Sequence, residues 1–393
     1  MLGFGTSDVY SRAVRIAELK IEDIAFGGKG VARENGKAVF VPFTIEGEKI
    51  AAQIVREKKQ FAEAEIADLR EDSPHRVTPA CPYFGRCGGC AYQHIDYEHQ
   101  LAIKWRQVRD VLQRIGKLKD IPMRPIIPSP VDYAYRNRIT VHAQEGVLGF
   151  YRRDSHRLID IEACPIAMDE VNRALADLRR RRVRDGHYTL RAETSPRVFS
   201  QTNDAVAKSL RDLIAQFVPA GQQLLIDAYC GAGFFAKALL DKFERVIGID
   251  WDRFAIEAAQ KNATAKETYI AGDIEEELDR ALTVAAPLSR GGAEPVAAAT
   301  ADSRKGDFQI APAVENRRSL VLLVDPPATG LSPNIRRAIV DLAPSTFIYV
   351  SCNPPTLARD LADLQKTFTI ESVTPLDMFP QTAEIEVAVH LHA

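Results

Sequence analysis

The C-terminal half of the chain alternates short apolar segments with helical patterns, and this alternation restricts the fold more than any other feature. Leu224–Asp227 and Val246–Asp250 each predict a buried strand that ends in an aspartate, and helical spacing follows over Ala255–Ala263. Leu320–Val324 and Phe347–Val350 are two further apolar segments of strand length. Such repetition predicts a mostly parallel, helix-covered sheet. We therefore expect a doubly wound, Rossmann-like α/β domain over residues 200–393.

The N-terminal half has a different pattern, and the chain is expected to be a multidomain α/β protein. Short apolar segments separated by Gly and Asn predict a small five-stranded barrel of the OB type, to which we assign residues 1–70. Residues 71–199 are expected to form an α+β central domain, with helices over Tyr97–Lys117 and Asp169–Arg182 and strands between Tyr133 and Ile161. The helix near residues 97–118 is expected to pack on the C-terminal domain. A loop insertion is expected over about 281–318, which is rich in Ala, Pro, Gly and Ser.

Composition excludes several classes of protein. The 393 residues are 46% hydrophobic and 26% charged, the balance of an ordinary globular protein and not of a disordered one. No apolar stretch approaches the roughly 18 residues of a membrane-spanning helix, and the first twenty residues lack the apolar core of a signal peptide. We expect a cytoplasmic protein with no membrane contact and no obligate protein partner.

Nucleic-acid binding would have to use local surface, because the net charge is only -2. Between Lys104 and Arg157 there are twelve Lys and Arg against five Asp and Glu, interleaved with aromatic residues. Such a mixture can hold phosphates and stack unpaired bases. A solvated face beside core aromatics is an equally good interpretation of any single residue there.

A glycine-containing loop follows the first predicted strand, in the segment Asp227-Ala-Tyr-Cys-Gly-Ala-Gly233. Its two glycines allow a sharp turn and a close approach of a ligand to the backbone. Asp250 ends the next strand, where an acid can accept hydrogen bonds from both hydroxyls of a ribose. A plain structural turn is the alternative, and the third glycine of the dinucleotide fingerprint is missing. With Asp273 and Asp325, the pattern resembles an S-adenosylmethionine-dependent methyltransferase and not a dehydrogenase.

Two later motifs contain reactive groups. In Ser351-Cys-Asn-Pro-Pro-Thr356, Cys352 follows an apolar strand, where ligands bind in open α/β sheets and a thiolate can act as a nucleophile. An inert buried cysteine is the alternative, but the neighbouring residues are polar. In Phe379-Pro-Gln-Thr-Ala-Glu-Ile-Glu386, two carboxylates two residues apart share one side of an extended strand, and one can be a general base. Alone, this motif is more typical of a solvated strand edge.

Together these motifs resemble the RNA 5-methyluridine (uracil-C5) methyltransferase family, in the branch with a TRAM domain and an iron–sulfur cluster. The family has a Ser-Cys-Asn-Pro-x-Thr loop and a Phe-Pro-x-Thr-x-His-x-Glu segment, and the match continues in 199–203 and in 325–330. It covers the whole chain, and the barrel is similar to a TRAM domain. Three positions depart from the family pattern: Glu384 replaces His, Ala328 replaces the Arg after Asp-Pro-Pro, and Phe234 replaces Asn.

The resemblance implies methylation of carbon 5 of a uridine in RNA, with S-adenosylmethionine as the donor. It implies that Cys352 adds to carbon 6 and that Glu386 is the base. The uridine would have to be unpaired or flipped out of a helix, and large-subunit (23S) ribosomal RNA is favoured over tRNA. The residues implied to contact the cofactor are Gln201, Tyr229, Phe234, Asp250, Asp273 and Asp325.

Four of the six cysteines lie in the central domain, as Cys81-x5-Cys87-x2-Cys90 and Cys164. Four thiolates can hold one zinc ion or one iron–sulfur cluster. A structural zinc site usually has two short Cys-x2-Cys pairs, and only one is present here. The resemblance favours a [4Fe-4S] cluster on these four cysteines.

Two other functions fit parts of the sequence. Asp325-Pro-Pro327 also occurs in methyltransferases that act on an amino nitrogen, a reaction that needs no thiol. A non-catalytic RNA-binding protein would keep the barrel and the cysteine segment without using Cys352.

Overall fold

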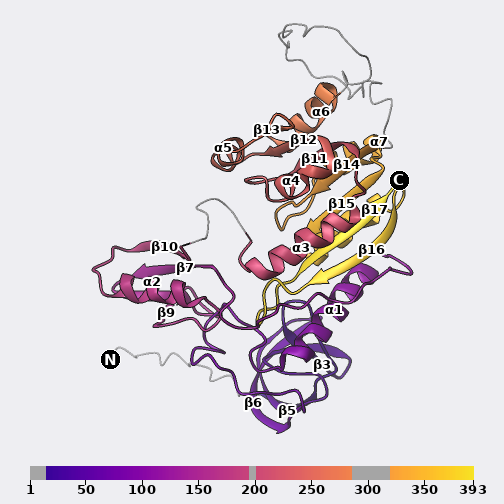
Figure 1. Ribbon diagram of the computed structural model, residues 1–393. Helices are drawn as coiled ribbons and strands as arrows, with labels where there is room; N and C mark the ends of the chain where they lie inside the picture. The colour runs from indigo at the N-terminus through magenta and orange to yellow at the C-terminus, as the bar shows by residue number, and fades with distance from the viewer. Residues whose placement is uncertain (1–14, 194–200, 286–318) are drawn as a thin grey trace, which may run out of the picture. The chain divides into compact units, whose positions relative to one another are not determined.

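The computed structural model describes residues 15–193, 201–285 and 319–393 (Figure 1). The chain divides into two compact units. The first contains the chain up to Ile103 together with the short segments Phe150–Ile159 and Gln381–Ala383. The second contains the remaining segments, which are 104–149, 160–380 and 384–393.

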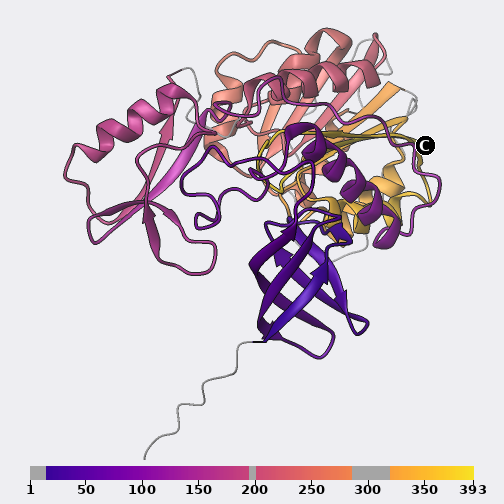
Figure 2. The same ribbon diagram turned by 90° about the horizontal axis from the view of Figure 1, so that it is seen from below.

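The first unit contains a six-stranded sheet that curls on itself (Figure 2). Its order is β1-β5-β6-β4-β3-β2, and residues alternate along β1 between exposed and buried, so that one face supplies an apolar core. The prediction of five strands was one too few. The extra strand is the two-residue β2, which pairs with β3 across the glycine-rich turn. The strands are β1 (Ile16–Lys20), β2 (Asp23–Ile24), β3 (Lys29–Glu34), β4 (Lys37–Pro42), β5 (Lys49–Glu57) and β6 (Phe61–Glu71).

The second unit contains a seven-stranded sheet of order β13-β12-β11-β14-β15-β17-β16. The first five strands in this order are parallel, and β17 is antiparallel to both of its neighbours. β14 is buried along its whole length, as its uninterrupted apolar sequence predicts for a strand covered on both faces. The strands are β11 (Gln222–Ala228), β12 (Phe243–Asp250), β13 (Glu267–Ala271), β14 (Leu320–Val324), β15 (Thr346–Ser351), β16 (Thr369–Leu376) and β17 (Glu386–His392).

Helices connect and flank this sheet, as Figure 1 shows. Side chains cap several of them: Asn203 accepts from the Val206 amide, and Ser332 accepts from the Ile335 amide next to a proline in the first turn. The doubly wound, Rossmann-like architecture predicted for the C-terminal region is therefore confirmed. The helices are α3 (Asp204–Phe217), α4 (Phe234–Leu239), α5 (Arg253–Gln260), α6 (Ile274–Ala285), α7 (Pro333–Leu342) and α8 (Pro354–Leu364), with a short 3-10 turn over Leu240–Lys242.

A four-stranded antiparallel sheet of order β10-β7-β8-β9 accompanies α2 (Asp169–Arg179). Strand β7 pairs with both β8 and β10 along residues predicted to be extended. The helix ends three residues earlier than the predicted Arg182. The strands are β7 (Arg138–Gln144), β8 (Val147–Tyr151), β9 (Leu158–Asp160) and β10 (Gly186–Arg191).

Helix α1 (Tyr97–Arg114) enters the second unit at Lys104. The Lys104 ammonium lies 2.6 Å from the Asp377 carboxylate, and both side chains are fully buried. Lys104 also donates to the carbonyl of Phe379 at 2.9 Å. The segment after α1 then runs beside β16, where the Arg124 amide donates to the Val373 carbonyl. Residues early in the chain thus hold the turn that leads into β17.

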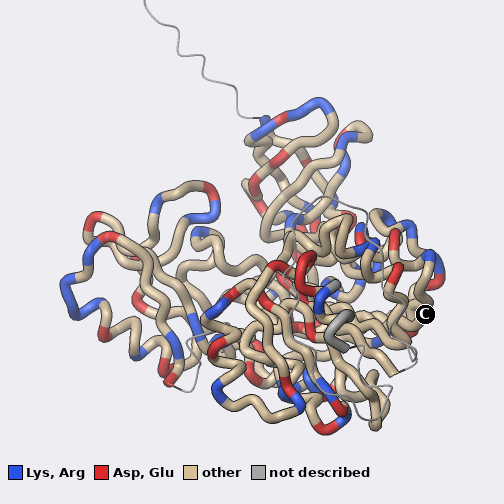
Figure 3. The backbone as a smooth tube through the Cα atoms, turned by 90° about the horizontal axis from the view of Figure 1, so that it is seen from above, with Lys and Arg blue, Asp and Glu red and all other residues tan. Residues whose placement is uncertain are grey.

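Charges of both signs are distributed along the described residues (Figure 3), in agreement with the small net charge. Among the described residues, no helix is long and apolar enough to cross a membrane. Helix α6 continues to Ala285, so the predicted insertion cannot begin at 281. Positions 286–318 of that insertion lie outside the described residues.

Candidate active site at the carboxyl edge of the sheet

The motifs singled out in the sequence meet at one edge of the seven-stranded sheet. Asp227 is the second-to-last residue of β11, Asp250 is the last residue of β12, and Asp325 follows β14 directly. Parallel strands bring their carboxyl ends to the same edge. Strand β17 runs the opposite way and begins at this edge, since Ser351 pairs with Val387. That register puts Glu386, the first residue of β17, next to Cys352.

Cys352 is exposed on the loop between β15 and α8. Partial loss of water around the sulfur, followed by the charges of Glu386 and Asp325, raises the pKa of this thiol to about 12. Glu384 adds a smaller effect in the same direction. The thiol is therefore accessible, but it is protonated at neutral pH until a positive charge or a proton acceptor reaches it.

Glu386 is buried, with 2% of its surface exposed. Its Oε1 atom is buried and has no hydrogen-bond partner among the described residues. Burial first, and then the charges of Asp325 and Glu384, raise the pKa of this carboxyl well above its ordinary value. A desolvated carboxylate with a raised pKa is a stronger proton acceptor than one in water.

Two further aspartates at this edge also have raised pKa values. Burial, helped by Asp250, raises the pKa of Asp325 to about 7. Burial is also the largest cause for Asp227, whose pKa rises to about 8 although it accepts a hydrogen bond from the Ala236 amide. Its other oxygen, Oδ1, is buried and has no hydrogen-bond partner in the part of the chain that the structure describes. The edge thus gathers several carboxyl groups that burial pushes toward the neutral form, and a cationic ligand bound beside them would favour their ionised form.

The glycine loop opens its backbone toward the same edge. Gly231 has a φ of 53°, and a Cβ placed there would meet no atom within 4 Å. Its amide donates to Asp250 Oδ2 at 2.8 Å, and the Asp252 amide donates to Oδ1 at 2.9 Å, so the backbone fixes this carboxylate. The preceding Tyr229 is also in the left-handed region, at a φ of 66°. This geometry fits a ligand that combines a ribose with a positive charge, as S-adenosylmethionine does.

The remaining predicted cofactor residues take varied positions. Asp273 is exposed just after β13 and accepts from the Glu275 amide at 2.8 Å, and its charge contributes to a raised pKa of Tyr229, for which burial is the largest cause. Phe234 begins α4, with the Arg211 guanidinium over its ring. Gln201 is buried, and its carbonyl accepts from the Asn137 side chain at 2.9 Å.

Sequence reasoning missed two aromatic residues beside Asp250. Trp251 is 74% exposed and Phe254 is 78% exposed. Two large exposed aromatic side chains three residues apart are candidates for contact with a ligand or partner. Their position directly after the acid-terminated strand was available in the sequence as a signal.

The cysteine segment does not form a comparable site. All six cysteines are reduced thiols. Cys81, Cys87 and Cys90 belong to the first unit, and Cys164 belongs to the second. Burial, and then the charge of Cys81, raise the pKa of Cys87. Among the described residues, no group of three or more His, Cys, Asp or Glu is placed to hold a metal ion. The predicted [4Fe-4S] cluster is therefore not supported.

Two family models match the chain. The model for tRNA (Uracil-5-)-methyltransferase matches residues 178–393, more than half of the chain, and the TRAM domain model matches residues 11–67. An uncharacterized RNA methyltransferase of Synechocystis sp. is 28% identical, with 99% of this chain and 98% of that protein aligned. Another from Bdellovibrio bacteriovorus is 30% identical, with 95% of this chain and 94% of that protein aligned.

A solved structure of similar fold is the Pyrococcus abyssi tRNA (uracil-54, C5)-methyltransferase in complex with S-adenosyl-L-homocysteine. It has a TM-score of 0.65 and 22% sequence identity, and the match covers 95% of this chain and all of that one. The fold and the acid-lined edge thus define an S-adenosylmethionine-dependent methyltransferase with an N-terminal TRAM domain. The chain belongs to the RNA (uracil-5-)-methyltransferase family. The family and the TRAM domain of the resemblance are thus confirmed, and its iron–sulfur branch is not.

Proposed function

We propose that this protein methylates carbon 5 of a uridine in RNA through a covalent adduct between Cys352 and carbon 6 of the base. The observation that supports the proposal most strongly is the pairing at the edge of the sheet. An exposed thiol lies beside a buried carboxyl that has a raised pKa and one oxygen to which no described residue donates a hydrogen bond.

The chemistry needs both groups. The Cys352 thiolate adds to carbon 6 and turns the uracil ring into an enolate, whose carbon 5 takes the methyl group. S-adenosylmethionine supplies that methyl group when bound. The carboxylate of Glu386 then accepts the proton on carbon 5, the double bond re-forms, and the thiolate leaves. Burial of Glu386 strengthens its basicity for this proton, which water would accept only poorly.

The bound cofactor would help to form the thiolate. Burial, and then the charges of Glu386 and Asp325, raise the pKa of Cys352 in the protein alone. A positively charged cofactor bound against Asp250 and Asp325 would offset these charges and lower that pKa. Trp251 and Phe254, exposed next to Asp250, would give the adenine ring an aromatic face.

For the substrate, we propose a uridine in large-subunit ribosomal RNA. An accessory RNA-binding barrel suits a target in a folded, single-stranded region, where shape and splayed bases are read. A tRNA substrate is the second candidate, because the Pyrococcus abyssi tRNA methyltransferase matches 95% of this chain.

The test compares ribosomal RNA fragments and tRNA transcripts as methyl acceptors at one stated salt concentration, since phosphate contacts dominate affinity. Mass mapping of the product should find 5-methyluridine in the ribosomal fragment. Methyl transfer to tRNA alone would replace the substrate proposal and leave the Cys352 chemistry in place. Methyl transfer to an amino nitrogen by the Cys352→Ala variant would overturn the proposed reaction.

A further inference from the structure

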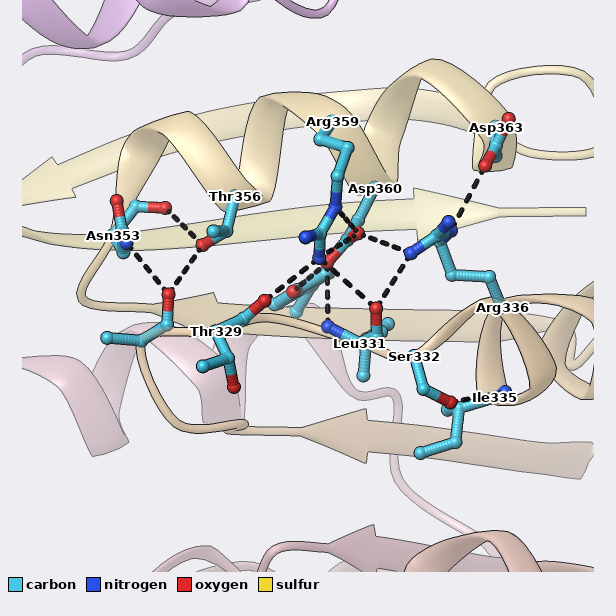
Figure 4. Close-up of polar contacts among 12 residues, drawn as sticks. Thr329, Leu331, Ser332, Ile335, Arg336, Asn353, Thr356, Arg359, Asp360 and Asp363 are labelled. Carbon is cyan, nitrogen blue, oxygen red and sulfur yellow. Dashed lines mark hydrogen bonds and ion pairs between the residues drawn. The ribbon is translucent and has the colours of Figure 1, made fainter.

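Helix α8, which follows Cys352, contains a fully buried carboxylate that receives four donors (Figure 4). Asp360 Oδ2 accepts from the Leu331 amide at 2.8 Å and from the Tyr349 hydroxyl at 2.7 Å. Its Oδ1 accepts from Arg336 and from Arg359, each at 2.9 Å. The two guanidinium groups compensate the charge of the buried carboxylate, which would otherwise be costly to desolvate. Asp360 thereby ties together α7, α8, β15 and the loop after β14.

The same helix holds that loop through its carbonyl groups. Asn353 Nδ2 and Thr356 Oγ1 both donate to the carbonyl of Ala328, at 2.7 and 3.0 Å. Arg359 donates to the carbonyl of Thr329 at 2.9 Å, as Figure 4 shows. Two successive carbonyl groups of the loop are therefore bound by side chains from α8.

Gly330 shows how closely the two segments approach. Its φ is 71°, and a Cβ there would lie 2.6 Å from Asp360 Oδ2 and 2.7 Å from the Arg359 guanidinium. These distances are too short for a contact between a methyl carbon and either polar atom. A residue with a Cβ at this position would therefore push the Asp360 or Arg359 side chain away. The contact between loop and helix is thus a close backbone approach and not a loose surface contact.

The loop begins at Asp325, and α8 begins two residues after Cys352. We propose that Arg359 and Asp360 are positioning residues, which fix the loop of Asp325 against the helix of Cys352 and so set the spacing of these two reactive positions. The inference rests on the proposed covalent reaction. Neither Arg359 nor Asp360 needs to touch substrate for this role, and reactions of this kind lose rate when reacting groups shift by about 1 Å.

Arg359→Gln tests this role, because the Arg359 side chain is 46% exposed and its loss should leave the fold intact. We expect kcat to fall between about tenfold and a hundredfold while KM for S-adenosylmethionine changes little. Arg359→Lys, which keeps the charge, should recover part of the rate. The matched control is Arg337→Gln, which removes a guanidinium from exposed α7 surface that contacts Asn334 and not the loop.

A second measurement does not depend on methyl transfer. The charge of Asp325 contributes to the raised pKa of Cys352. A loop released by Arg359→Gln, or by Thr356→Val, should weaken that effect, so the pH profile of Cys352 alkylation shifts to lower pH in mass spectrometry of the Cys352 peptide. The pH profile of Arg337→Gln should match that of the unaltered protein.

The outcomes separate the two proposals. An unchanged kcat and alkylation profile in both loop variants, with only a lower melting temperature, would overturn the positioning role. If the unaltered protein forms no adduct with uridine-containing RNA but the alkylation profile still shifts, the proposed reaction fails while the positioning role stands.

Discussion

Cys352 and Cys87 are both thiols whose pKa is raised first by burial, but their surroundings differ. The neighbours of Cys352 that matter are carboxylates on other elements of the sheet, Glu386 and Asp325. The charged neighbour that raises the pKa of Cys87 is another thiol, Cys81, which lies six residues earlier in the same turn-rich segment. A site assembled from distant strands is complete once the sheet forms. A site drawn from one short segment needs something further, such as a bound metal, to bring its thiolates together.

Removal of the Cys352 thiol should have the largest effect. Cys352→Ala should reduce methyl transfer to RNA below detection, because the proposed adduct with carbon 6 forms through this thiol. Binding of S-adenosylmethionine, measured by calorimetry, should stay nearly unchanged. Arg337→Gln, on the exposed surface of α7, is the control. Residual turnover in Cys352→Ala would contradict a reactive role for the edge.

Neutralising the buried base should slow turnover by about 10²–10⁴-fold. In the Glu386→Gln variant, the thiol should still add to carbon 6 and the methyl group should still reach carbon 5. The amide cannot then remove the proton from carbon 5. A protein–RNA adduct that survives denaturation should therefore accumulate on gels. The exposed Glu384 provides the matched control through Glu384→Gln. If the control traps the adduct and Glu386→Gln does not, the base is Glu384.

The same variant should also change the thiol, with a smaller effect. Because the charge of Glu386 raises the pKa of Cys352, its removal should lower that pKa, although burial remains the largest cause. At pH 8 a larger fraction of thiolate should then be present, and alkylation of Cys352 should speed up by about threefold for each half unit of pKa. A slower rate in Glu386→Gln would show that Glu386 helps to deprotonate the thiol in the protein alone.

The smallest effect is expected for substitution of Cys87. Cys87→Ser should change the affinity for S-adenosylmethionine by less than about twofold, because Cys87 lies outside the unit that contains the carboxylates. Iron analysis of anaerobically purified protein sharpens the result. About four irons per chain would restore the cluster predicted from the cysteine spacing, whereas iron-free protein agrees with the described arrangement.

Local sequence determined the elements of the sheet and the type of reactive residue on each. The apolar segments ending at Asp227 and Asp250 became parallel strands because uninterrupted apolar runs are stable when both faces are covered. The register of β17 could not be read from its sequence. An apolar segment of that kind can form a strand in either direction. Only the antiparallel pairing with β15 places Glu386, the first residue of β17, at the reactive edge.

What the sequence by itself determined is the class of the protein, because the order of strands, glycine loop, thiol and carboxylates requires no knowledge of distant contacts. The tertiary structure alone decided the chemical state of these groups. The pKa values of Glu386 and Asp325 depend on burial and on nearby carboxylates. The hydrogen bond from Arg359 to the Thr329 carbonyl joins residues 30 positions apart. Desolvation and charge act through space, so they appear only when the chain is folded.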